Sequence, residues 1–234
     1  MRVKSMIILS TLIVLVIFLL IFKPINNKEY KNFEKLKAKE VENKDYTISH
    51  KKSDSRVLLI AIHGGGIEPG TTELIEGIAK DNSYSYYSFN GIKQTGNQSM
   101  HITSTHFDEP QGLDLVKKSL VTVSFHGYEE RDQKHTYLGG LDTGLAKEIA
   151  KQLKKAGFSV SDAPKELSGK EKDNITNKNK RGKGVQLEIS TAQREAFFKN
   201  NDLSSKNRKH KETTFYEYTS AIEAALKINH KNNK

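Results

Sequence analysis

The chain has 234 residues, a formal net charge of +10 and no cysteine. This length allows one main domain with an appendage, and the missing cysteine excludes disulfides, thiolate metal ligands and lipid attachment through a thiol. The excess of lysine and arginine indicates an anionic partner, which is a nucleic acid, a membrane surface or an acidic polymer, unless the charge only keeps the surface soluble.

The first segment of the chain is a candidate membrane segment. Arg2 and Lys4 precede seventeen largely apolar residues, 6–22, a length at the lower limit of a membrane span. No cleavage site with small residues follows, so we predict that residues 1–24 are an uncleaved signal anchor with a transmembrane helix. This predicts a single-pass protein of the cell membrane with an extracytoplasmic catalytic domain. Residues 25–45 are polar and rich in lysine, which predicts a tether.

Residues 57–70 combine a strand with a glycine-rich turn. The first six are apolar and rich in β-branched side chains, which predicts a buried strand of an α/β sheet. His63 comes where this strand ends, three glycines follow, and Glu68 lies five residues after the histidine. Ligands of open α/β sheets bind beyond the carboxyl ends of the strands. We therefore expect this imidazole and carboxylate to belong to a functional site.

Two other kinds of site can be excluded for this turn. No lysine follows the glycines as a phosphate-binding P-loop requires. The chain also contains no GxSxG nucleophile elbow, so the turn has no partner as the oxyanion strip of an α/β-hydrolase. The remaining interpretations are a metal site and a glycine-rich turn with two solvated side chains.

A second predicted strand repeats the pattern of the first. Residues 120–125 form an apolar run that ends in His126 and Gly127. Parallel strands present their carboxyl ends on the same side of a sheet, so His63 and His126 are predicted neighbours in space. Together with Glu68 they make the two-histidine, one-carboxylate set of a catalytic zinc that keeps an open position.

Alternating apolar runs predict an α/β domain over residues 46–230, with a three-layer open mixed sheet and helices on both faces. The tail, residues 231–234, is predicted to be disordered. Further predicted strands are residues 84–89, 137–142, 158–160 and 185–190, and the predicted helices are residues 72–80, 111–118, 143–156 and 213–230.

Glu188 and the basic loop before it are further candidates. Glu188 lies between two apolar residues of the strand predicted at 185–190. A buried carboxylate is costly unless it is paired or used, so Glu188 is a candidate general base, unless it faces outward from an edge strand. Residues 166–184 are polar and basic, which predicts a flexible loop. Its cations either bind a carboxylate or phosphate or are only solvated.

Four motifs follow one another along the chain, namely HGGGIEPGT at 63–71, HITSTHFDEP at 101–110, SFHGY at 124–128 and GKGVQLEIS at 182–190. In this order they resemble the phage-type poly-γ-glutamate hydrolase family over residues 46–226. The resemblance implies a fold related to zinc carboxypeptidases and zinc-dependent hydrolysis of γ-glutamyl bonds.

The resemblance also implies roles for single residues. His63, Glu68 and His126 would hold Zn²⁺, and Glu188 would be the general base. The first histidine and glutamate are five residues apart here, as in that family, whereas ordinary zinc carboxypeptidases have them three apart. The roles of His101, His106 and Tyr128 stay open. The residues implied to grip a substrate carboxylate are Asn177, Lys178 and Arg181.

We therefore expect a monomeric, membrane-anchored zinc hydrolase that cleaves γ-glutamyl amide bonds in poly-γ-glutamate or a similar anionic polymer, and no nucleic-acid partner. One alternative is a zinc amidohydrolase that acts on acylated amino acids or cell-wall peptides. Another is a non-catalytic protein that binds an anionic wall polymer through its basic face.

Overall fold

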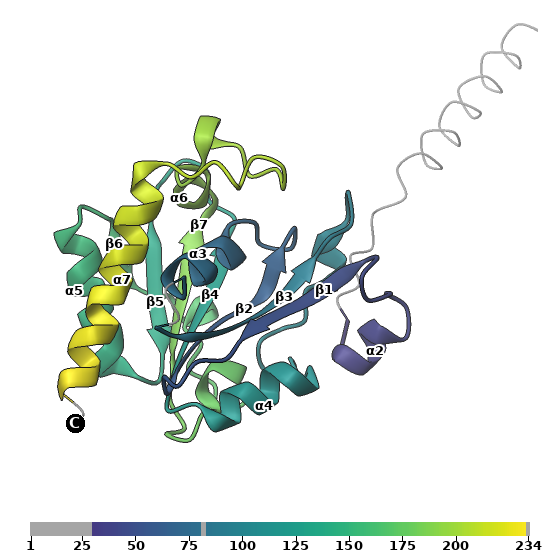
Figure 1. The fold of residues 1–234 in the computed structure, drawn as a ribbon, viewed down its shortest axis with the longest axis horizontal. Coiled ribbons are helices and arrows are strands. Elements are labelled where there is room, and N and C mark those ends of the chain that lie inside the picture. Colours follow the sequence, from purple (N-terminus) through teal and green to yellow (C-terminus); the bar gives the residue numbers. More distant parts are fainter. Residues whose placement is uncertain (1–29, 81–82, 233–234) are drawn as a thin grey trace, which may run out of the picture.

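The computed structural model describes residues 30–80 and 83–232. A seven-stranded mixed sheet forms its centre, with the strand order β1-β3-β2-β4-β7-β5-β6, and helices cover both faces of this sheet (Figure 1). The strands are β1 (Tyr46–Lys51), β2 (Val57–Gly65), β3 (Ser85–Gly91), β4 (Val121–Tyr128), β5 (Thr136–Gly140), β6 (Val160–Asp162) and β7 (Val185–Ser190).

The helices connect successive strands or close the chain. They are α2 (Phe33–Lys37), α3 (Thr71–Ile78), α4 (Pro110–Lys118), α5 (Thr143–Lys155), α6 (Thr191–Glu195) and α7 (Thr213–Asn232). Short 3₁₀ turns occur at η1 (Asn97–Met100), η2 (Lys165–Leu167), η3 (Ile175–Asn177) and η4 (Lys199–Asn201).

The direction of the strands decides where a site can form. β3, β2, β4 and β7 run parallel to one another, so their carboxyl ends lie at one end of the sheet. β1 and β5 are antiparallel to their neighbours β3 and β7, and β6 is parallel to β5. The loops after β2, β4 and β7 therefore meet at a single edge, where open α/β sheets bind their ligands.

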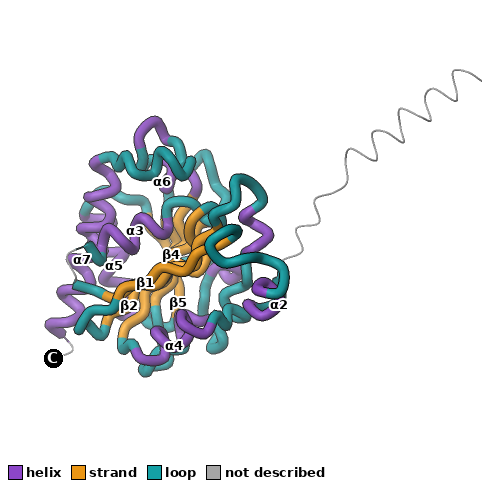
Figure 2. Tube along the Cα trace, turned by 45° about the vertical axis from the view of Figure 1, so that its right-hand side comes forward, coloured by secondary structure: helices purple, strands orange, loops and turns teal. Residues whose placement is uncertain are grey.

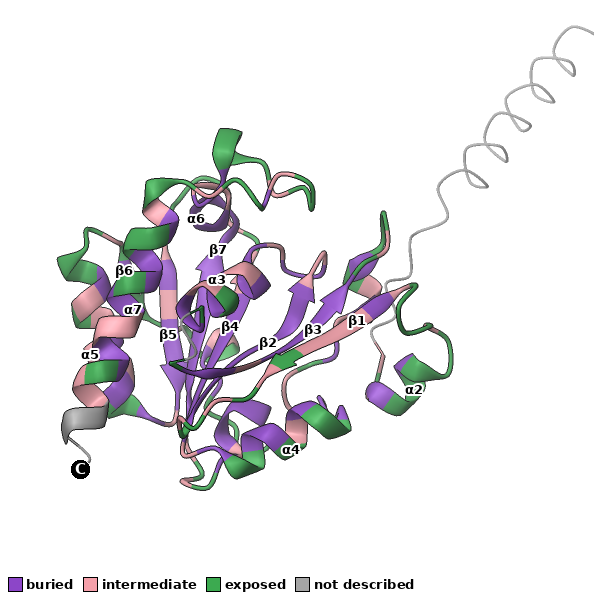
Figure 3. Cartoon of the chain, viewed as in Figure 1, coloured by how far each residue is buried: buried purple, intermediate pink, exposed green. Residues whose placement is uncertain are grey.

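Both faces of the sheet are packed, which explains the continuous apolar run in β2. Leu59 and Ala61 belong to the core on one face, together with residues of α3, α5 and α7. Leu58, Ile60 and Ile62 belong to the core on the other face, together with residues of α2 and α4. Successive side chains of a strand alternate between faces, so a strand that is covered on both sides has no polar face (Figures 2 and 3).

The predicted fold class must be corrected in one respect, the transmembrane helix. Among residues 30–80 and 83–232, no helix is long and apolar enough to cross a membrane. The segment for which we predicted the signal anchor, residues 1–24, lies outside the described residues. The single pass through the membrane and the extracytoplasmic position of the domain were predicted from that same segment.

The predicted tether also differs from the structure, because its described part packs on the domain. α2 lies within the segment predicted as a tether, and its Phe33 and Leu36 are buried. Phe33 makes edge-to-face ring contacts with Tyr46 and Phe89, at centroid distances of 6.0 and 6.2 Å. These two apolar residues anchor an otherwise polar segment on the domain. At the other end of the chain, α7 continues to Asn232, into the tail predicted to be disordered.

Candidate metal centre

Three predicted site residues lie at the carboxyl ends of neighbouring parallel strands. His63 is near the end of β2, His126 is near the end of β4, and Glu188 lies opposite His126 in β7. The order β2-β4-β7 brings these distant parts of the sequence together. All three residues are buried, with 1%, 2% and 6% of their surfaces exposed.

The turn after β2 returns Glu68 to His63. The backbone N–H of Glu68 donates a hydrogen bond to the carbonyl oxygen of His63 over 2.8 Å. Gly65 has a φ of +65°, in the left-handed region that favours glycine. A Cβ at Gly64 would come within 2.3 Å of a neighbouring hydroxyl oxygen. The glycines therefore allow a turn that is tight enough to place the carboxylate beside the imidazole.

Glu68 and the two imidazoles converge on one point. His63 Nδ1 lies 2.9 Å from Glu68 Oε1 and 3.1 Å from His126 Nδ1. Glu68 Oε2 lies 3.6 Å from His126 Nδ1, and it accepts a hydrogen bond from the backbone N–H of Gly127 over 2.9 Å. Ligand atoms of a tetrahedral ion held at about 2.1 Å lie about 3.4 Å from one another. The contacts in this cluster bracket that separation.

The protonation of His63 explains why this cluster suits a cation. His63 Nε2 lies 2.8 Å from the carbonyl oxygen of Ile102, which can only accept, so Nε2 carries the proton and donates it. The other ring nitrogen, Nδ1, faces the Glu68 carboxylate and the nitrogen of His126. A positive charge between these groups satisfies them, and the backbone bond on Nε2 fixes the ring as it does for metal-bound histidines.

His101 joins the cluster and is a candidate ligand that the sequence did not assign. Its ring stacks on His63 with the centroids 3.8 Å apart, and its Nε2 lies 3.7 Å from Glu68 Oε1. His63, Glu68 and His101 each offer one ligand atom within 4.8 Å of the others. His106, from the same motif, is exposed and does not line the cavity around the cluster.

The two carboxylates of the site differ in acidity because His63 and His126 act most strongly on Glu68. Burial raises the pKa of Glu188 to about 7, although the charge of His126 opposes this and Glu68 adds to it. Burial also raises the pKa of Glu68, but His63 and His126 outweigh that effect and hold the pKa well below its usual range. Burial lowers the pKa of His101 to about 3, so its imidazole is neutral near pH 7. The site combines an ionised carboxylate with one that titrates near neutrality.

Arg194 holds the backbone around the cluster and was missed in the sequence. It is buried, with 4% exposed, and its guanidinium donates to the carbonyl oxygens of Ile189, Pro69 and Tyr128 over 3.1, 2.9 and 3.4 Å. Ile189 and Pro69 directly follow Glu188 and Glu68, and Tyr128 lies two residues after His126. Arg194 therefore ties together the three chain segments that carry the cluster and the adjacent carboxylate.

The cluster opens into a cavity of about 480 Å³. On one wall, Gln186 Nε2 donates to Glu188 Oε1 over 2.9 Å, and Asn174 Nδ2 donates to Gln186 Oε1 over 2.9 Å. This chain of amides orients the Glu188 carboxylate. No lysine or arginine occurs among the described residues that line the cavity. The other polar side chains of the lining are Thr103, Ser104, Thr105, Tyr128, Glu166 and Glu171.

The structure does not bring the residues predicted to grip a substrate carboxylate into the lining of this cavity. Asn177, Lys178 and Arg181 are not among the residues that line the cavity. The loop that carries them reaches the cavity earlier in the chain, because Asn174, three residues before Asn177, is among the lining residues.

The contacts of these residues show what the loop does instead. Asn177 is buried, donates to the carbonyl oxygens of Gly169 and Glu171, and accepts from the backbone N–H of Gly184. Arg181 Nη2 forms an ion pair with Asp142 over 2.9 Å. Side-chain amides thus replace regular backbone pairing and order a loop that we predicted to be flexible.

Comparison with known proteins shows the family of this chain and its fold. The family model described as poly-gamma-glutamate hydrolase matches residues 30–221. A solved structure of bacteriophage poly-gamma-glutamate hydrolase is 41% identical, with a TM-score of 0.84 over 86% of this chain and 97% of that one. The zinc-free structure of YndL is 39% identical, with a TM-score of 0.79 over 85% of this chain and 96% of that one.

The chain is also similar to a protein of Bacillus subtilis over most of its length. The SPbeta prophage-derived protein YoqZ of Bacillus subtilis (strain 168) is 44% identical over 196 residues, which cover 83% of this chain and 70% of YoqZ. The chain therefore belongs to the poly-gamma-glutamate hydrolase family. The family and the enzyme class predicted from the sequence, a γ-glutamyl hydrolase, are confirmed.

Proposed function

We propose that the protein cleaves γ-glutamyl amide bonds of poly-γ-glutamate or a similar anionic polymer, with a zinc ion held by His63, Glu68 and His126. The observation that carries the proposal is the convergence of two imidazole nitrogens and a carboxylate within 2.9–3.6 Å, all buried at the strand ends. His101 is a further candidate ligand of the same ion.

The donor set supports zinc among the divalent ions. Imidazole and carboxylate ligands that leave one position open are typical of catalytic zinc sites. The imidazole of His63 is oriented for this role, because its hydrogen bond to the backbone carbonyl of Ile102 directs Nδ1 toward the cluster. The solved zinc-free form of a relative also supports zinc as the ion.

The chain supplies a proton carrier beside this cluster. Glu188 is the direct partner of His126 in the β4–β7 ladder and lines the same cavity. A zinc ion bound here would act as a Lewis acid, which polarises the carbonyl of the scissile amide and lowers the pKa of a bound water. Glu188 accepts the proton of the attacking water and delivers it to the leaving amine. A pKa of about 7 matches this task, because the carboxylate can both take and return a proton.

The walls of the cavity indicate how a substrate carboxylate is bound there. Thr103, Ser104 and Thr105 provide hydroxyl donors, and Tyr128 provides a phenol near the end of β4. Neutral donors fix the orientation of a carboxylate by directional hydrogen bonds. They contribute less long-range attraction for a polyanion than cations do.

Metal analysis and polymer cleavage test the proposal together. We expect the purified protein to contain about one zinc per chain and to shorten poly-γ-glutamate, and we expect a chelator to abolish cleavage until zinc is restored. A protein that takes up no zinc, or one that cuts the polymer equally well with chelator, contradicts the mechanism. Cleavage of acylated amino acids or cell-wall peptides with the polymer left intact would assign a different substrate to the same site.

A further inference from the structure

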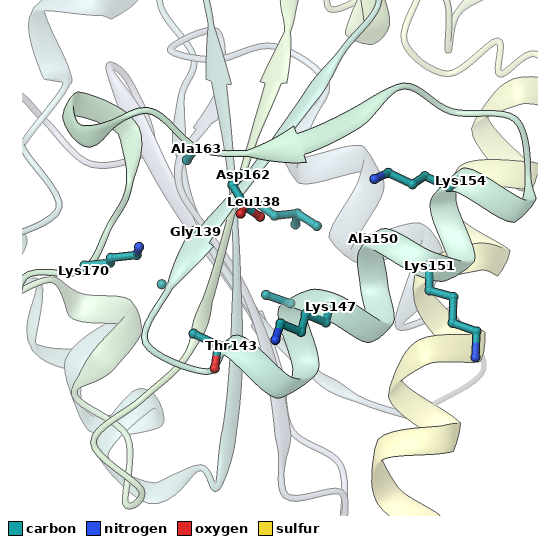
Figure 4. Close-up of a pocket in the computed structure, with 12 residues that line it drawn as sticks. Leu138, Gly139, Thr143, Lys147, Ala150, Lys151, Lys154, Asp162, Ala163 and Lys170 are labelled. Atoms are coloured by element: carbon teal, nitrogen blue, oxygen red, sulfur yellow. The ribbon is translucent and has the colours of Figure 1, made fainter.

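A second concave surface lies next to the catalytic cavity and carries the opposite charge. We call it the lysine groove. It has a volume of about 540 Å³ and lies between α5, β5 and the edge strand β6 (Figure 4). Leu138, Ala146, Ala150 and Ala163 give it an apolar floor. Its charged lining consists of Lys147, Lys151, Lys154, Lys170 and Asp162.

Three of the four lysines direct their ammonium groups into the lysine groove. Lys147 and Lys154 are seven residues apart on α5, so they lie on one face of the helix two turns from each other. Lys170 reaches in from the opposite side, and Lys151 points away (Figure 4). None of the four makes an ion pair with another residue in the described part of the chain. Asp162 alone opposes their charge among the described lining residues.

One segment of the chain lines both the lysine groove and the catalytic cavity. We call residues 163–171 the wall segment. Its Ala163 and Lys170 line the groove, whereas its Glu166 and Gly169 line the cavity. The wall segment lies directly on β5, where the backbone N–H of Gly140 donates to the carbonyl oxygen of Ser168 over 2.7 Å. A polymer chain that leaves the cavity across the wall segment therefore reaches the lysine groove.

We propose that the lysine groove is a second binding site for the polymer substrate, which takes the carboxylates of residues remote from the bond that is cut. This rests on the proposed function. Poly-γ-glutamate carries a free carboxylate on every residue, and the described cavity lining offers it no cation. Binding at two linked sites raises the effective concentration of the polymer at the second site, and charge in a groove attracts a polyanion from solution.

The test compares a long polymer with a short substrate in the full chain. In the triple variant Lys147→Ala, Lys154→Ala and Lys170→Ala, we expect KM for long poly-γ-glutamate to rise about fivefold to tenfold, the sum of three exposed ion pairs. We expect kcat, and all constants for a short γ-glutamyl oligomer, to change less than about twofold. The matched control, Lys35→Ala, Lys37→Ala and Lys117→Ala, removes the same charge from α2 and α4. An equal rise of KM in the control overturns the proposal.

A binding experiment separates this proposal from the proposed function. Both triple variants are combined with Glu188→Gln, and fluorescence anisotropy measures their affinity for labelled poly-γ-glutamate. A loss of about fivefold or more in the groove variant, with less than twofold in the control, supports the lysine groove. Equal affinities in the two variants overturn it. If the wild-type protein does not cut the polymer, the proposed function fails, and the anisotropy result still decides whether the groove binds a polyanion.

Discussion

The catalytic cavity and the lysine groove are neighbours with opposite physical designs. The cavity buries its key groups, holds them by hydrogen bonds and has no lysine or arginine in its described lining. The groove has exposed lysines on an apolar floor and no ion pairs with described residues to hold them. Chemistry needs fixed groups at short distances, whereas attraction of a polymer needs only charge within a Debye length, about 8 Å at physiological salt.

With zinc bound as proposed, the difference also explains why the cations lie outside the cavity. A lysine beside the imidazoles would repel a divalent ion and compete with it for Glu68. Coulomb energy between two unit charges 4 Å apart is about 4 kcal/mol at a surface-like effective dielectric constant. A wall of one chain segment between lysines and cluster keeps the attraction for the polymer without this competition. Changes in the cavity should therefore affect catalysis strongly, and changes in the groove should affect only capture of the polymer.

The largest effect is expected from the cluster itself. Replacing Glu68 by Gln removes the negative charge between two imidazoles, so we expect loss of bound zinc and of measurable polymer cleavage. Metal analysis and a viscosity or gel assay of the polymer measure both. The control is His106→Ala, an exposed histidine of the neighbouring motif. A Glu68→Gln protein that keeps its zinc and its activity would remove Glu68 from the set of ligands.

Glu188→Gln should have the next largest effect, and it should change kcat only. The amide cannot carry the proton, so we expect kcat to fall about 10²–10⁴-fold, while zinc content and KM change little. Glu166→Gln is the matched control, because Glu166 lines the same cavity but is exposed. Loss of zinc from the Glu188→Gln protein would instead show that Glu188 is a ligand.

Arg194→Lys is expected to act through position. Lysine has one ammonium group and cannot reach three carbonyl oxygens that the guanidinium bridges. We expect zinc affinity and kcat/KM to fall about 10- to 100-fold, as for other residues that orient metal ligands. Competition with a chelator measures the affinity. Arg131→Lys, an exposed arginine paired with Glu195, is the control. Unchanged zinc affinity in the Arg194→Lys protein would limit Arg194 to a packing role.

The smallest effect is expected from salt, and it separates the two regions. Raising ionic strength from about 0.01 to 0.15 M shortens the Debye length from about 30 to 8 Å. KM for long poly-γ-glutamate should then rise, and kcat for a short γ-glutamyl oligomer should stay constant. The triple lysine variant of the groove should show a weaker salt dependence of KM than the wild type. An identical dependence in both proteins would place the attraction elsewhere on the surface.

Strong periodicity made most of the central sheet predictable. The apolar runs of β2 and β4 end in histidine and glycine, and the rule for parallel strands was enough to bring His63 and His126 together. α5 and α7 followed from apolar residues at helical spacing. In these segments the local apolar pattern and the tertiary packing favour the same secondary structure.

The remaining parts depend on contacts that a local pattern does not contain. β1 and α2 have few apolar residues and are ordered by packing on distant rings. The loop before β7 is polar, and it is fixed by the amide of Asn177. His101 and Arg194 reach the site from segments without a regular period. The only signal for Arg194 in the sequence was its place four residues after the buried strand β7.

Gly139 packs against the wall segment between the catalytic cavity and the lysine groove, and this contact limits how the sequence can change. A Cβ at this residue of β5 would come within 2.2 Å of the carbonyl oxygen of Ser168 in the wall segment. A side chain at Gly139 would displace the wall segment, and this would change the volumes of the catalytic cavity and the lysine groove together. A substitution at Gly139 that enlarges the catalytic cavity would therefore also change the shape of the lysine groove. Evolution of the two binding regions is coupled through this one backbone contact.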